Sequence, residues 1–569
     1  MPFRKRFISL AAAAALTLTA IPAAYAAPPA DPAPVNLAAG LSYQLSAPPS
    51  ASYPDSGNEL TDGQYAGNAY SDPKWQAHLR GMQRTVSFDL GQVQSVSKVK
   101  AHFMQDTAAG IHFPQKVRVL VSEDGEEWGT LADINSSIPL YETGPQPLKQ
   151  DYVWDGAVDG LPRGNPNATM VTARYVKVEF TTDVWVFVDE IEIWGVNGKA
   201  HSAKHLPKDS DKPVAEPGYL KAGEATAGIH DLVLLYNGWY ANGFGDWMKD
   251  AIVPYISYVD ANRQPKDWFF DGVLYLGLNA PSKRSFMESG TPSNKEDWEW
   301  YLNKTFAAEG DMQQLNEAAK ETAQKLGDPS HKVKVSLMIP YPAVKQSQFG
   351  DVDGDGVSEN FDYAVVGHEQ AYANKQKAVK WYIDKAMELW DQGAYSNLEL
   401  AAMYWLSEKV SLSSSHEEDL IRYTSDLVHG ENKKFFWIPF FDANRFYQWK
   451  ELGFDAAVLQ PNYFFTTTTP DSRITEAASY AKRYGMGIEI ETHEGIVKPG
   501  APTSDGDVWR GRYLAYLNGG IDYGYMTDAF MAYYQGGDTF LRAATSTDPV
   551  ARETYEWTYR FVKGTYAKP

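Results

Sequence analysis

Two different hydrophobic patterns divide the chain. From about Asn36 to Asn197, short segments alternate apolar and polar residues with a period near two and are rich in β-branched residues. This alternation is typical of strands that bury one face. It predicts an N-terminal antiparallel β-sandwich over residues 36–197, with the clearest strands at residues 84–90, 117–122, 174–180 and 188–194.

A second pattern begins after residues 198–218, whose three prolines, four lysines and few apolar residues predict a linker. Strand-like apolar runs then alternate with helix-like stretches such as residues 313–326, 368–392 and 473–484. Eight such repeats predict a (β/α)8 TIM barrel over residues 219–569, and the alternative is a doubly wound open sheet. The predicted strands cover residues 231–236, 272–278, 332–339, 398–405, 434–439, 456–460, 486–491 and 520–525.

The first residues predict export from the cell. Arg4, Lys5 and Arg6 precede an apolar stretch at residues 7–20, and Ala24-Tyr25-Ala26 offers small residues for cleavage. We therefore expect a bacterial signal peptide at residues 1–26 and a secreted, extracellular protein, with an uncleaved membrane anchor as the alternative. No later stretch is apolar enough to predict membrane insertion.

Composition narrows the expected partners. The net charge of −20 argues against nucleic acid and anionic membranes as main partners, because both require a basic surface. The absence of cysteine excludes thiol nucleophiles and cysteine-ligated zinc. The 17 Trp and 35 Tyr favour a polysaccharide or oligosaccharide partner, although core packing explains most single aromatic residues.

Carboxylates follow two of the predicted barrel strands. Glu408 lies just beyond the fourth strand, and Glu491 ends the seventh. Chemistry in TIM barrels occurs at the carboxyl ends of the strands, and glycoside hydrolysis requires one protonated and one ionised carboxyl group. Strand alternation places Glu489 on the same face as Glu491 but one layer deeper. Glu494, beyond the strand, is the alternative nucleophile, and solvated loop carboxylates or ion-pair partners are the simpler interpretation.

Other residues near strand ends are candidate substrate contacts. Trp239, Tyr341 and Trp405 are candidate platforms for sugar rings, although each is also a candidate core residue. In the loop after the second strand, Lys283 and Arg284 are candidates for an anionic sugar. The remaining candidates are polar residues in this loop and after the fifth, sixth and eighth strands: Asn279, Asp442, Asn462 and Asp528.

Residues 351–362 resemble a calcium-binding loop. Oxygen ligands occupy positions one, three, five and nine, a glycine occupies the sharp turn at position six, and a backbone carbonyl and a carboxylate follow at seven and twelve. We expect a structural Ca²⁺ here and no organic cofactor, with an acidic surface turn as the alternative. The candidate ligands are Asp351, Asp353, Asp355, Val357, Glu359 and Asp362.

The N-terminal unit resembles the discoidin, or factor V/VIII C-type, domain. The resemblance rests on residues 60–63, 86–91, 119–128 and 174–178, and on the closing residues 189–195. It implies a discoidin-like jelly roll that binds glycans and holds a structural calcium ion. In this sequence it assigns that ion to Asp62 and Glu190.

The larger unit resembles a secreted bacterial family catalogued as domain of unknown function 4855, through residues 267–278, 293–301 and 404–408. That resemblance implies a glycosidase-like barrel. Glutamates at the ends of the fourth and seventh strands also resemble the large clan of retaining glycosidases. This second resemblance implies that Glu408 is the acid/base and Glu491 the nucleophile, although Ser407 stands where the clan usually has asparagine.

Together these observations predict an extracellular glycoside hydrolase that acts on a polysaccharide by a retaining mechanism. A carboxyl separation of about 5–5.5 Å would indicate retention, and roughly 6.5–9.5 Å inversion. Two alternatives remain open: a non-catalytic glycan-binding surface protein with a degenerate barrel, and a polysaccharide lyase that uses a Tyr, His or Lys base on a uronic acid.

Overall fold

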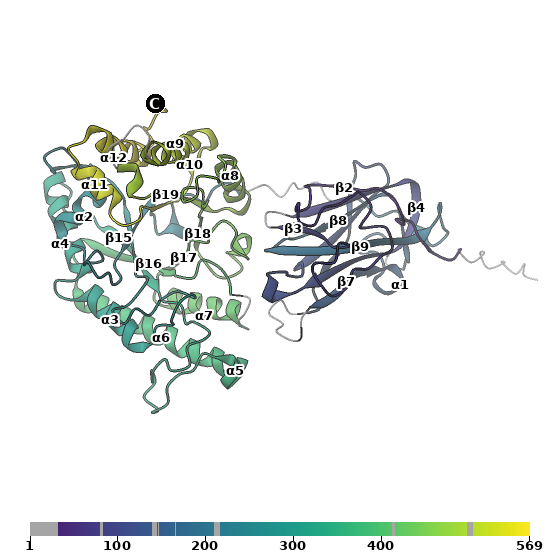
Figure 1. Ribbon diagram of the computed structural model, residues 1–569, viewed down its shortest axis with the longest axis horizontal. Coiled ribbons are helices and arrows are strands. Elements are labelled where there is room, and N and C mark those ends of the chain that lie inside the picture. The colour runs from purple at the N-terminus through teal and green to yellow at the C-terminus, as the bar shows by residue number, and fades with distance from the viewer. Residues whose placement is uncertain are drawn as a thin grey trace, which may run out of the picture.

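The structure is a computed structural model that describes residues 32–79, 83–138, 145, 147–165, 167–209, 217–411, 416–497 and 505–569, without the side chains of residues 505 and 506. Figure 1 shows a strand-rich N-terminal unit, in purple and blue, beside a larger unit of strands and helices. The predicted signal peptide, residues 1–26, and part of the predicted linker, residues 198–218, lie outside the described residues. Within those residues, no helix has both the length and the apolar character needed to cross a membrane.

The N-terminal unit is a β-sandwich, as predicted. Its strands follow the order β1-β9-β4-β8-β5-β6, with β2 and β7 also paired to β4, β3 to β9 and β10 to β8. All these pairs are antiparallel except β8 with β10. The strands are β1 (Val35–Asn36), β2 (Gln44–Leu45), β3 (Gln76–Leu79), β4 (Arg84–Gln105), β5 (Lys116–Ser122), β6 (Gly129–Asn135), β7 (Leu148–Asp155), β8 (Met170–Phe180), β9 (Trp185–Val196) and β10 (Ala203–Lys204), with short helices η1 (Thr107–Ala109) and α1 (Gly156–Asp159).

The long strand β4 connects the two parts of the sandwich. Its first part pairs with β8, and its later part pairs with β7 and β9. The pairing with β8 is interrupted between Asp89 and Gln94, and Gly91 in this interval has a φ of 79°, in the left-handed region that glycine adopts without strain. Apolar side chains such as Val86, Phe88 and Val178 are buried in the core.

The C-terminal unit contains a closed barrel of eight parallel strands, which excludes the open-sheet alternative. Each strand pairs with the next along the chain, and β20 pairs with β11 to close the barrel. The barrel strands are β11 (Asp231–Tyr236), β14 (Gly272–Leu276), β15 (Val333–Ile339), β16 (Leu398–Trp405), β17 (Lys434–Trp437), β18 (Ala456–Leu459), β19 (Gly487–Glu491) and β20 (Met531–Tyr534); β12 (Ser257–Val259) and β13 (Pro265–Trp268) form a separate small sheet.

Helical segments connect the barrel strands, and Figure 1 shows several of them toward the edge of this unit, with barrel strands nearer its centre. The segments before and between the strands are η2 (Glu224–Thr226), α2 (Lys249–Ile256), α3 (Lys295–Phe306), α4 (Asp311–Leu326), α5 (Tyr363–Val366), α6 (His368–Gly393), α7 (Glu417–Gly430), η3 (Phe446–Gln448), α8 (Ser472–Tyr484), η4 (Glu494–Val497), α9 (Asp505–Tyr523) and α10 (Tyr525–Asp528). After the last strand follow α11 (Thr539–Thr545) and α12 (Pro549–Val562).

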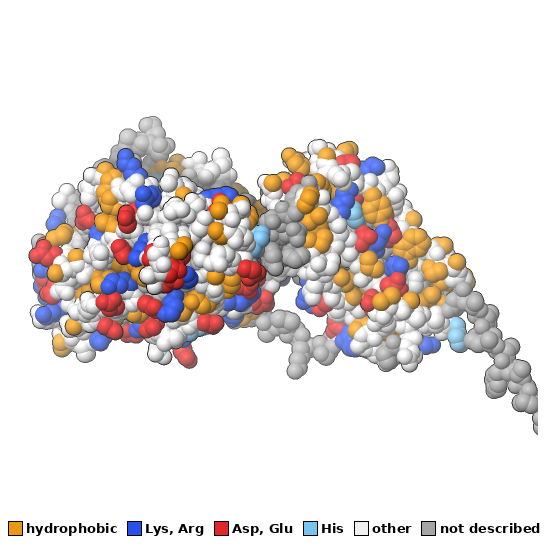
Figure 2. Space-filling view, turned by 90° about the horizontal axis from the view of Figure 1, so that it is seen from below, with side chains coloured by type: hydrophobic (Ala, Val, Ile, Leu, Met, Phe, Trp, Pro, Cys, Tyr) orange, Lys and Arg blue, Asp and Glu red, His pale blue; other side chains and the backbone are white. Residues whose placement is uncertain are grey.

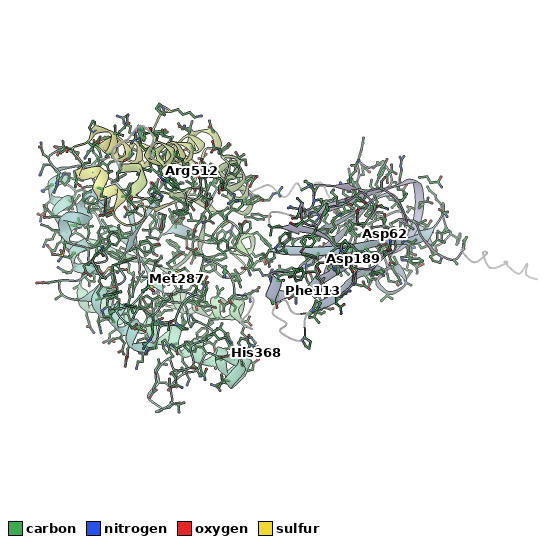
Figure 3. All side chains as sticks on the ribbon, viewed as in Figure 1. Asp62, Phe113, Asp189, Met287, His368 and Arg512 are labelled. Atoms are coloured by element: carbon green, nitrogen blue, oxygen red, sulfur yellow. The ribbon has the colours of Figure 1, made fainter. Side chains whose placement is uncertain are left out.

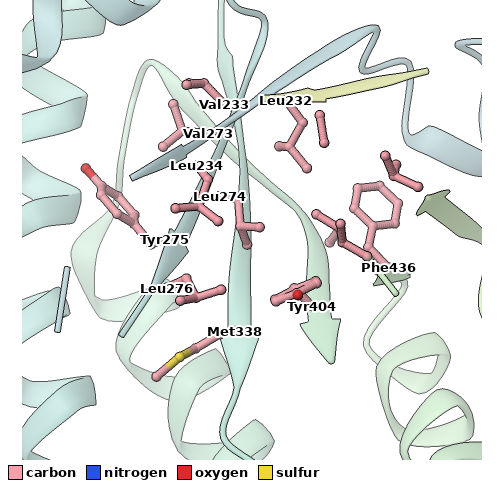
Figure 4. Packing of buried hydrophobic residues seen from close by; sticks show 14 of the residues in the cluster. Leu232, Val233, Leu234, Val273, Leu274, Tyr275, Leu276, Met338, Tyr404 and Phe436 are labelled. Carbon is pink, nitrogen blue, oxygen red and sulfur yellow. The ribbon is translucent and has the colours of Figure 1, made fainter. Parts of the chain in front are cut away.

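Apolar side chains fill much of the barrel. Figure 4 shows Leu232 and Leu234 from β11, Leu274 from β14 and Phe436 from β17 packed together, and all four are buried. Burial of large aliphatic and aromatic side chains is the main favourable contribution to the stability of such a core.

Seven of the eight predicted barrel strands match observed strands to within two residues at either end, and the eighth is wrong. Residues 520–525 end α9 and begin α10, and the eighth strand is β20 (Met531–Tyr534). A Cβ atom on Gly519 would lie 2.8 Å from the Ile474 side chain, and one on Gly520 would lie 2.3 Å from the Phe561 ring. These glycines therefore allow α9 to approach its neighbours closely. Because they contribute no apolar side chain at buried positions, they interrupt the apolar periodicity by which a helix is predicted.

The two units meet at a buried ion pair. Arg445, just before η3, has 1% of its side chain exposed, and its Nη1 atom lies 3.4 Å from the carboxylate of Asp183 in the sandwich. The Nε atom of Arg445 lies 2.9 Å from Glu418 in α7. One arginine thus connects the sandwich to the barrel unit.

Candidate active site

A cavity of about 260 Å³ opens at the carboxyl ends of the barrel strands. This is the face of a parallel barrel where loops bring polar side chains together. The cavity contains two carboxylates, three tyrosines, two amide side chains and an apolar remainder. Its lining residues are Leu234, Tyr236, Leu276, Leu278, Met287, Tyr404, Leu406, Glu408, Ile438, Gln460, Asn462, Phe465, Glu489 and Tyr534.

Glu408 reaches the cavity from the turn after β16. The Ser407 hydroxyl donates to the Lys409 carbonyl, and the Trp437 indole donates to the Ser407 carbonyl over 2.8 Å, so the turn is held against β17. Burial raises the pKa of Glu408 to about 7; Gln460 lowers it in part, while the negative charges of nearby glutamates raise it further. A carboxyl group with this pKa is suited to donate a proton near neutral pH.

Glu489 supplies the second carboxylate of the cavity. It lies in the middle of β19, beside Ala532 of β20, and its side chain is 3% exposed. Burial raises the pKa of Glu489 well above its usual value, and the charges of Glu491 and Glu408 add to the effect. The two cavity carboxylates therefore interact electrostatically, so that retention of a proton by one favours ionisation of the other.

Glu491 does not line the cavity. Its side chain is fully buried and accepts hydrogen bonds from the backbone amides of Asn462, Tyr463 and Phe464, at 2.8, 3.0 and 3.2 Å. The Tyr516 hydroxyl of α9 donates to the same carboxylate over 2.5 Å. These donors occupy both carboxylate oxygens, so Glu491 organises the loop after β18 instead of facing a substrate.

Three tyrosines surround the carboxylates. Tyr236 ends β11, Tyr404 lies near the end of β16 and Tyr534 ends β20. Burial raises the pKa of all three hydroxyls, with added repulsion from Glu408. The hydroxyls are therefore neutral near pH 7 and can donate hydrogen bonds to a bound sugar.

The predicted aromatic platforms lie outside the cavity. Tyr341 is 2% exposed and Trp405 is fully buried, so both belong to the core, and their rings pack edge to face at 6.0 Å. Trp239 is partly exposed, but it is not among the lining residues. The prediction that Tyr341 and Trp405 stack on sugar is therefore wrong, because no sugar can reach their faces.

The loop after β14 also differs from its predicted role. Arg284 donates to the buried carboxylate of Asp297 over 3.0 Å, so its charge is already paired. Lys283 is exposed, and Asn279 hydrogen-bonds through its carbonyl to the Trp239 amide. None of these three residues lines the cavity.

Of the four remaining candidate residues, only one lines the cavity. Asn462 lines the cavity. Asp442 is partly buried but is not a lining residue, and Glu494, the alternative nucleophile, is exposed on η4 and does not line the cavity either. Asp528 precedes β20 and pairs with Lys221 over 3.2 Å; it was misplaced because the eighth strand was predicted in the wrong segment.

Sequence reasoning missed a further carboxylate near the cavity. Glu288 follows the lining residue Met287, which Figure 3 labels in the barrel unit, and its charge acts on Glu408. One carboxylate oxygen of Glu288 is buried and has no hydrogen-bond partner within the described residues. No strand-end or motif pattern marks this position, because Glu288 lies in an irregular loop.

The acidic loop brings three of its candidate ligands together. Single carboxylate oxygens of Asp351, Asp353 and Asp355 lie within 4.8 Å of one another. Asp353 and Glu359 also share Lys377, at 2.6 and 3.4 Å. The other two candidates differ: Val357 has an exposed side chain, and Asp362 accepts a hydrogen bond from the first turn of α5. The three aspartates fit a hard cation, with Lys377 as a competing positive charge.

In the sandwich, Glu190 is fully buried and accepts hydrogen bonds from the Gly63 amide. Burial raises the pKa of Glu190 to about 7, and the charge of Asp62 contributes to the rise. The calcium site that the discoidin resemblance implies at Asp62 and Glu190 stays a prediction. Figure 3 labels Asp62 and Asp189, the neighbour of Glu190 in sequence, in the sandwich.

Comparison with known proteins agrees with the two-unit organisation. The profile of the family described as Domain of unknown function (DUF4855) matches residues 231–560, and that of the F5/8 type C domain matches residues 46–191. No curated protein matches the chain.

Solved structures similar to part of the chain include a chitosan-binding module from the chitosanase/glucanase of Paenibacillus sp. IK-5, with 20% identity over 28% of this chain and 99% of that one, at a TM-score of 0.20. A fucose binding module of Streptococcus pneumoniae has 12% identity over 28% of this chain and 96% of that one, at a TM-score of 0.21. With its family profile matched over more than half of its length, the chain belongs to the DUF4855 family, and an F5/8 type C domain precedes the matched region.

Proposed function

We propose that the chain is an extracellular glycoside hydrolase with a (β/α)8 catalytic domain. The observation that carries this proposal is the pairing of Glu408 and Glu489 in one cavity at the carboxyl ends of the barrel strands. Both carboxyl groups have raised pKa values, because burial and mutual repulsion disfavour their ionised forms. Such a pair suits glycoside hydrolysis, which requires a proton donor and an ionised carboxylate.

In the proposed retaining mechanism, Glu408 gives its proton to the glycosidic oxygen as the bond to the leaving sugar breaks. A carboxylate oxygen of Glu489 bonds to the anomeric carbon in the same step. Glu408 then removes a proton from water, whose oxygen replaces Glu489 at that carbon and releases the free enzyme. Glu489 takes the role that the sequence assigned to Glu491, because the carboxylate of Glu491 is fully occupied by loop amides and Tyr516.

The test is release of reducing ends by the mature protein from a panel of bacterial and plant polysaccharides. We expect Glu408→Gln and Glu489→Gln each to lower turnover by about 100-fold to 10,000-fold, because each removes one carboxyl group of the pair. Glu494→Gln is the matched control and should retain turnover, because Glu494 is exposed and does not line the cavity. Wild-type turnover should fall as the pH rises through about 7, where Glu408 loses its proton.

Near-normal turnover in either cavity variant would overturn the assignment. The anomeric form of the first product, followed by NMR, separates retention from inversion. Binding of glycan without any reducing-end release would instead favour the non-catalytic alternative, in which the barrel only captures a polysaccharide.

We further propose that the sandwich binds glycan and presents the barrel to its substrate. The F5/8 type C match and the predicted signal peptide at residues 1–26 support an extracellular role of this kind. A lyase that acts on a uronic acid has less support. Among the described residues, no lysine, arginine or histidine lines the cavity to neutralise the carboxylate of such a substrate.

A further inference from the structure

The ionisable side chains in and around the cavity are predominantly acidic. Glu408 and Glu489 line it, Glu491 lies behind the loop that follows β18, and Glu288 acts on Glu408 from the loop after β14. Glu408 experiences repulsion from both Glu288 and Glu491, and Glu489 experiences repulsion from Glu408 and Glu491. Four carboxyl groups thus lie in or near the cavity and act on one another.

Nearby cationic side chains make contacts outside the cavity. Arg284 pairs with Asp297. Arg512 lies over the ring of Tyr463 and donates to the Thr469 carbonyl over 3.1 Å. None of these arginines is among the lining residues, so the described part of the chain supplies no counter-charge at the cavity itself.

The neutral groups of the cavity also favour a cation. Tyr236, Tyr404, Tyr534 and Phe465 line it, and aromatic ring faces attract positive charge. The amide side chains of Gln460 and Asn462 can bind hydroxyl groups of a sugar. A positively charged ligand would therefore find both carboxylates and aromatic rings, whereas an anionic ligand would be repelled.

We propose that the sugar bound in this cavity carries a free, protonated amino group, so that the substrate is a polysaccharide of amino sugars with unacetylated amines. This inference rests on the proposed function and adds the substrate class. The ammonium group would stabilise the ionised form of Glu489, which the empty cavity disfavours, and would thereby prepare the nucleophile only when a substrate is bound. An N-acetylated or neutral sugar lacks this charge, and a uronic acid has the opposite one.

The experiment measures binding in a protein that cannot turn over. The full-length mature Glu408→Gln variant is titrated calorimetrically with four oligosaccharides of equal length. Their sugar units are glucosamine, N-acetylglucosamine, glucose and galacturonate. We expect the glucosamine oligosaccharide to bind at least about tenfold more tightly than the others, because Glu489 still lines the cavity and no cationic side chain among the described lining residues pairs with it. The double variant Glu408→Gln/Glu489→Gln should lose most of this preference while keeping the unfolding midpoint of the single variant or a higher one.

Repeating the titration in two buffers with different ionisation enthalpies reports the protons exchanged. Binding of the amino sugar should release protons from the Glu408→Gln protein, and fewer from the double variant, because the ammonium ion favours ionised Glu489. Equal affinity for the glucosamine and N-acetylglucosamine oligosaccharides would overturn the proposal, as would tighter binding of the galacturonate. A preference that persists unchanged in the double variant would also overturn it, because the amine would then bind outside the cavity.

The two proposals fail in different ways. If the wild type hydrolyses no polysaccharide but the cavity-dependent preference is present, the glycosidase assignment fails and the amine-binding cavity stands. If the wild type hydrolyses a neutral polysaccharide in a Glu408-dependent manner and shows no preference for amines, the reverse holds.

Discussion

Glu489 and Glu491 are two residues apart on one strand, yet their surroundings differ completely. Glu489 faces the cavity with Glu408, whereas Glu491 accepts hydrogen bonds from three consecutive backbone amides and a tyrosine. A carboxylate that accepts this many hydrogen bonds is fixed in position by its donors. The two residues should therefore respond differently to substitution.

We predict that Glu491→Ala lowers the free energy of unfolding by on the order of 3 kcal/mol, because it leaves several buried donors without an acceptor. Chemical denaturation followed by tryptophan fluorescence measures this change. Glu494→Ala, at an exposed position nearby in sequence, is the control and should change stability by less than about 0.5 kcal/mol. A stable Glu491→Ala protein without turnover would instead return the nucleophile to Glu491.

A second prediction concerns stability against pH. The pKa of Glu408 is raised to about 7 by burial, so the folded state binds more protons than the unfolded state between about pH 4.5 and 7. Its contribution to stability is therefore present below this window and is lost as the pH rises through it. Glu408→Gln removes the ionisable group, so the variant should gain stability relative to the wild type at pH 8 but not at pH 4.

Thermal unfolding at both pH values checks this sign. An equal difference between variant and wild type at pH 4 and pH 8 would show that Glu408 does not titrate abnormally.

At the scale of elements, the sequence predicted most of the fold. The strands at residues 398–405 and 434–437 are short apolar runs bounded by polar residues, and the alternation in residues 174–180 matches β8. The eighth barrel strand was missed because the glycine-containing end of α9 resembles a strand more strongly than β20 (Met531–Tyr534) does. Tight helix packing at Gly519 and Gly520 is a tertiary constraint, which local periodicity does not report.

The candidate site was predicted less completely. Glu408 and Asn462 were found because each lies three residues beyond the end of a barrel strand, β16 and β18 respectively. Periodicity placed Glu489 and Glu491 on one face but gave no information on which of them the loop after β18 would cover. Glu288 has no local signal, since it reaches the site from an irregular loop. Burial of Trp405 likewise depends on tertiary neighbours such as Tyr341 and Phe435, which local periodicity does not report.

The loop at residues 351–362 carries a prediction of its own. If Ca²⁺ binds the three clustered aspartates, a concentration 100 times its dissociation constant should stabilise the protein by about 2.7 kcal/mol. Asp353→Asn should reduce this effect, and Lys377→Met should enhance it, because Lys377 competes for Asp353 over 2.6 Å. Unfolding midpoints with Ca²⁺ and with a chelator measure both changes.

The variant Glu190→Gln shows whether the stabilising calcium ion binds this loop or the candidate ion site in the sandwich. A calcium effect that Glu190→Gln abolishes and Asp353→Asn leaves intact would assign the stabilising ion to the N-terminal unit.

At the scale of the whole molecule, the Asp183–Arg445 pair couples the two units. Arg445 is buried, so loss of Asp183 leaves its charge with Glu418 as the remaining carboxylate partner at this contact. We predict that Asp183→Ala destabilises the chain by about 2 kcal/mol and separates the unfolding transitions of the two units. Calorimetry detects such a separation directly.

The matched control is Lys221→Ala, which removes an exposed ion pair with Asp528 and should have an effect below about 1 kcal/mol. Equal effects of the two substitutions would show that the contact between the units is no stronger than a surface ion pair.

Elsewhere on the surface, Figure 2 shows acidic and basic side chains interspersed, with no continuous basic area on the face in view.

The separate surroundings of the two β19 glutamates have an evolutionary consequence. Glu489 accepts none of the hydrogen bonds that hold the loop after β18, so on the proposed function relatives that lost Glu489 alone would keep this loop but lose hydrolysis. Substitution of Glu491 removes the acceptor that holds that loop and would be tolerated only where the loop itself has been remodelled. On the proposed function, the pattern of these two positions across relatives would thus distinguish relatives that lost hydrolysis from relatives with an altered substrate range.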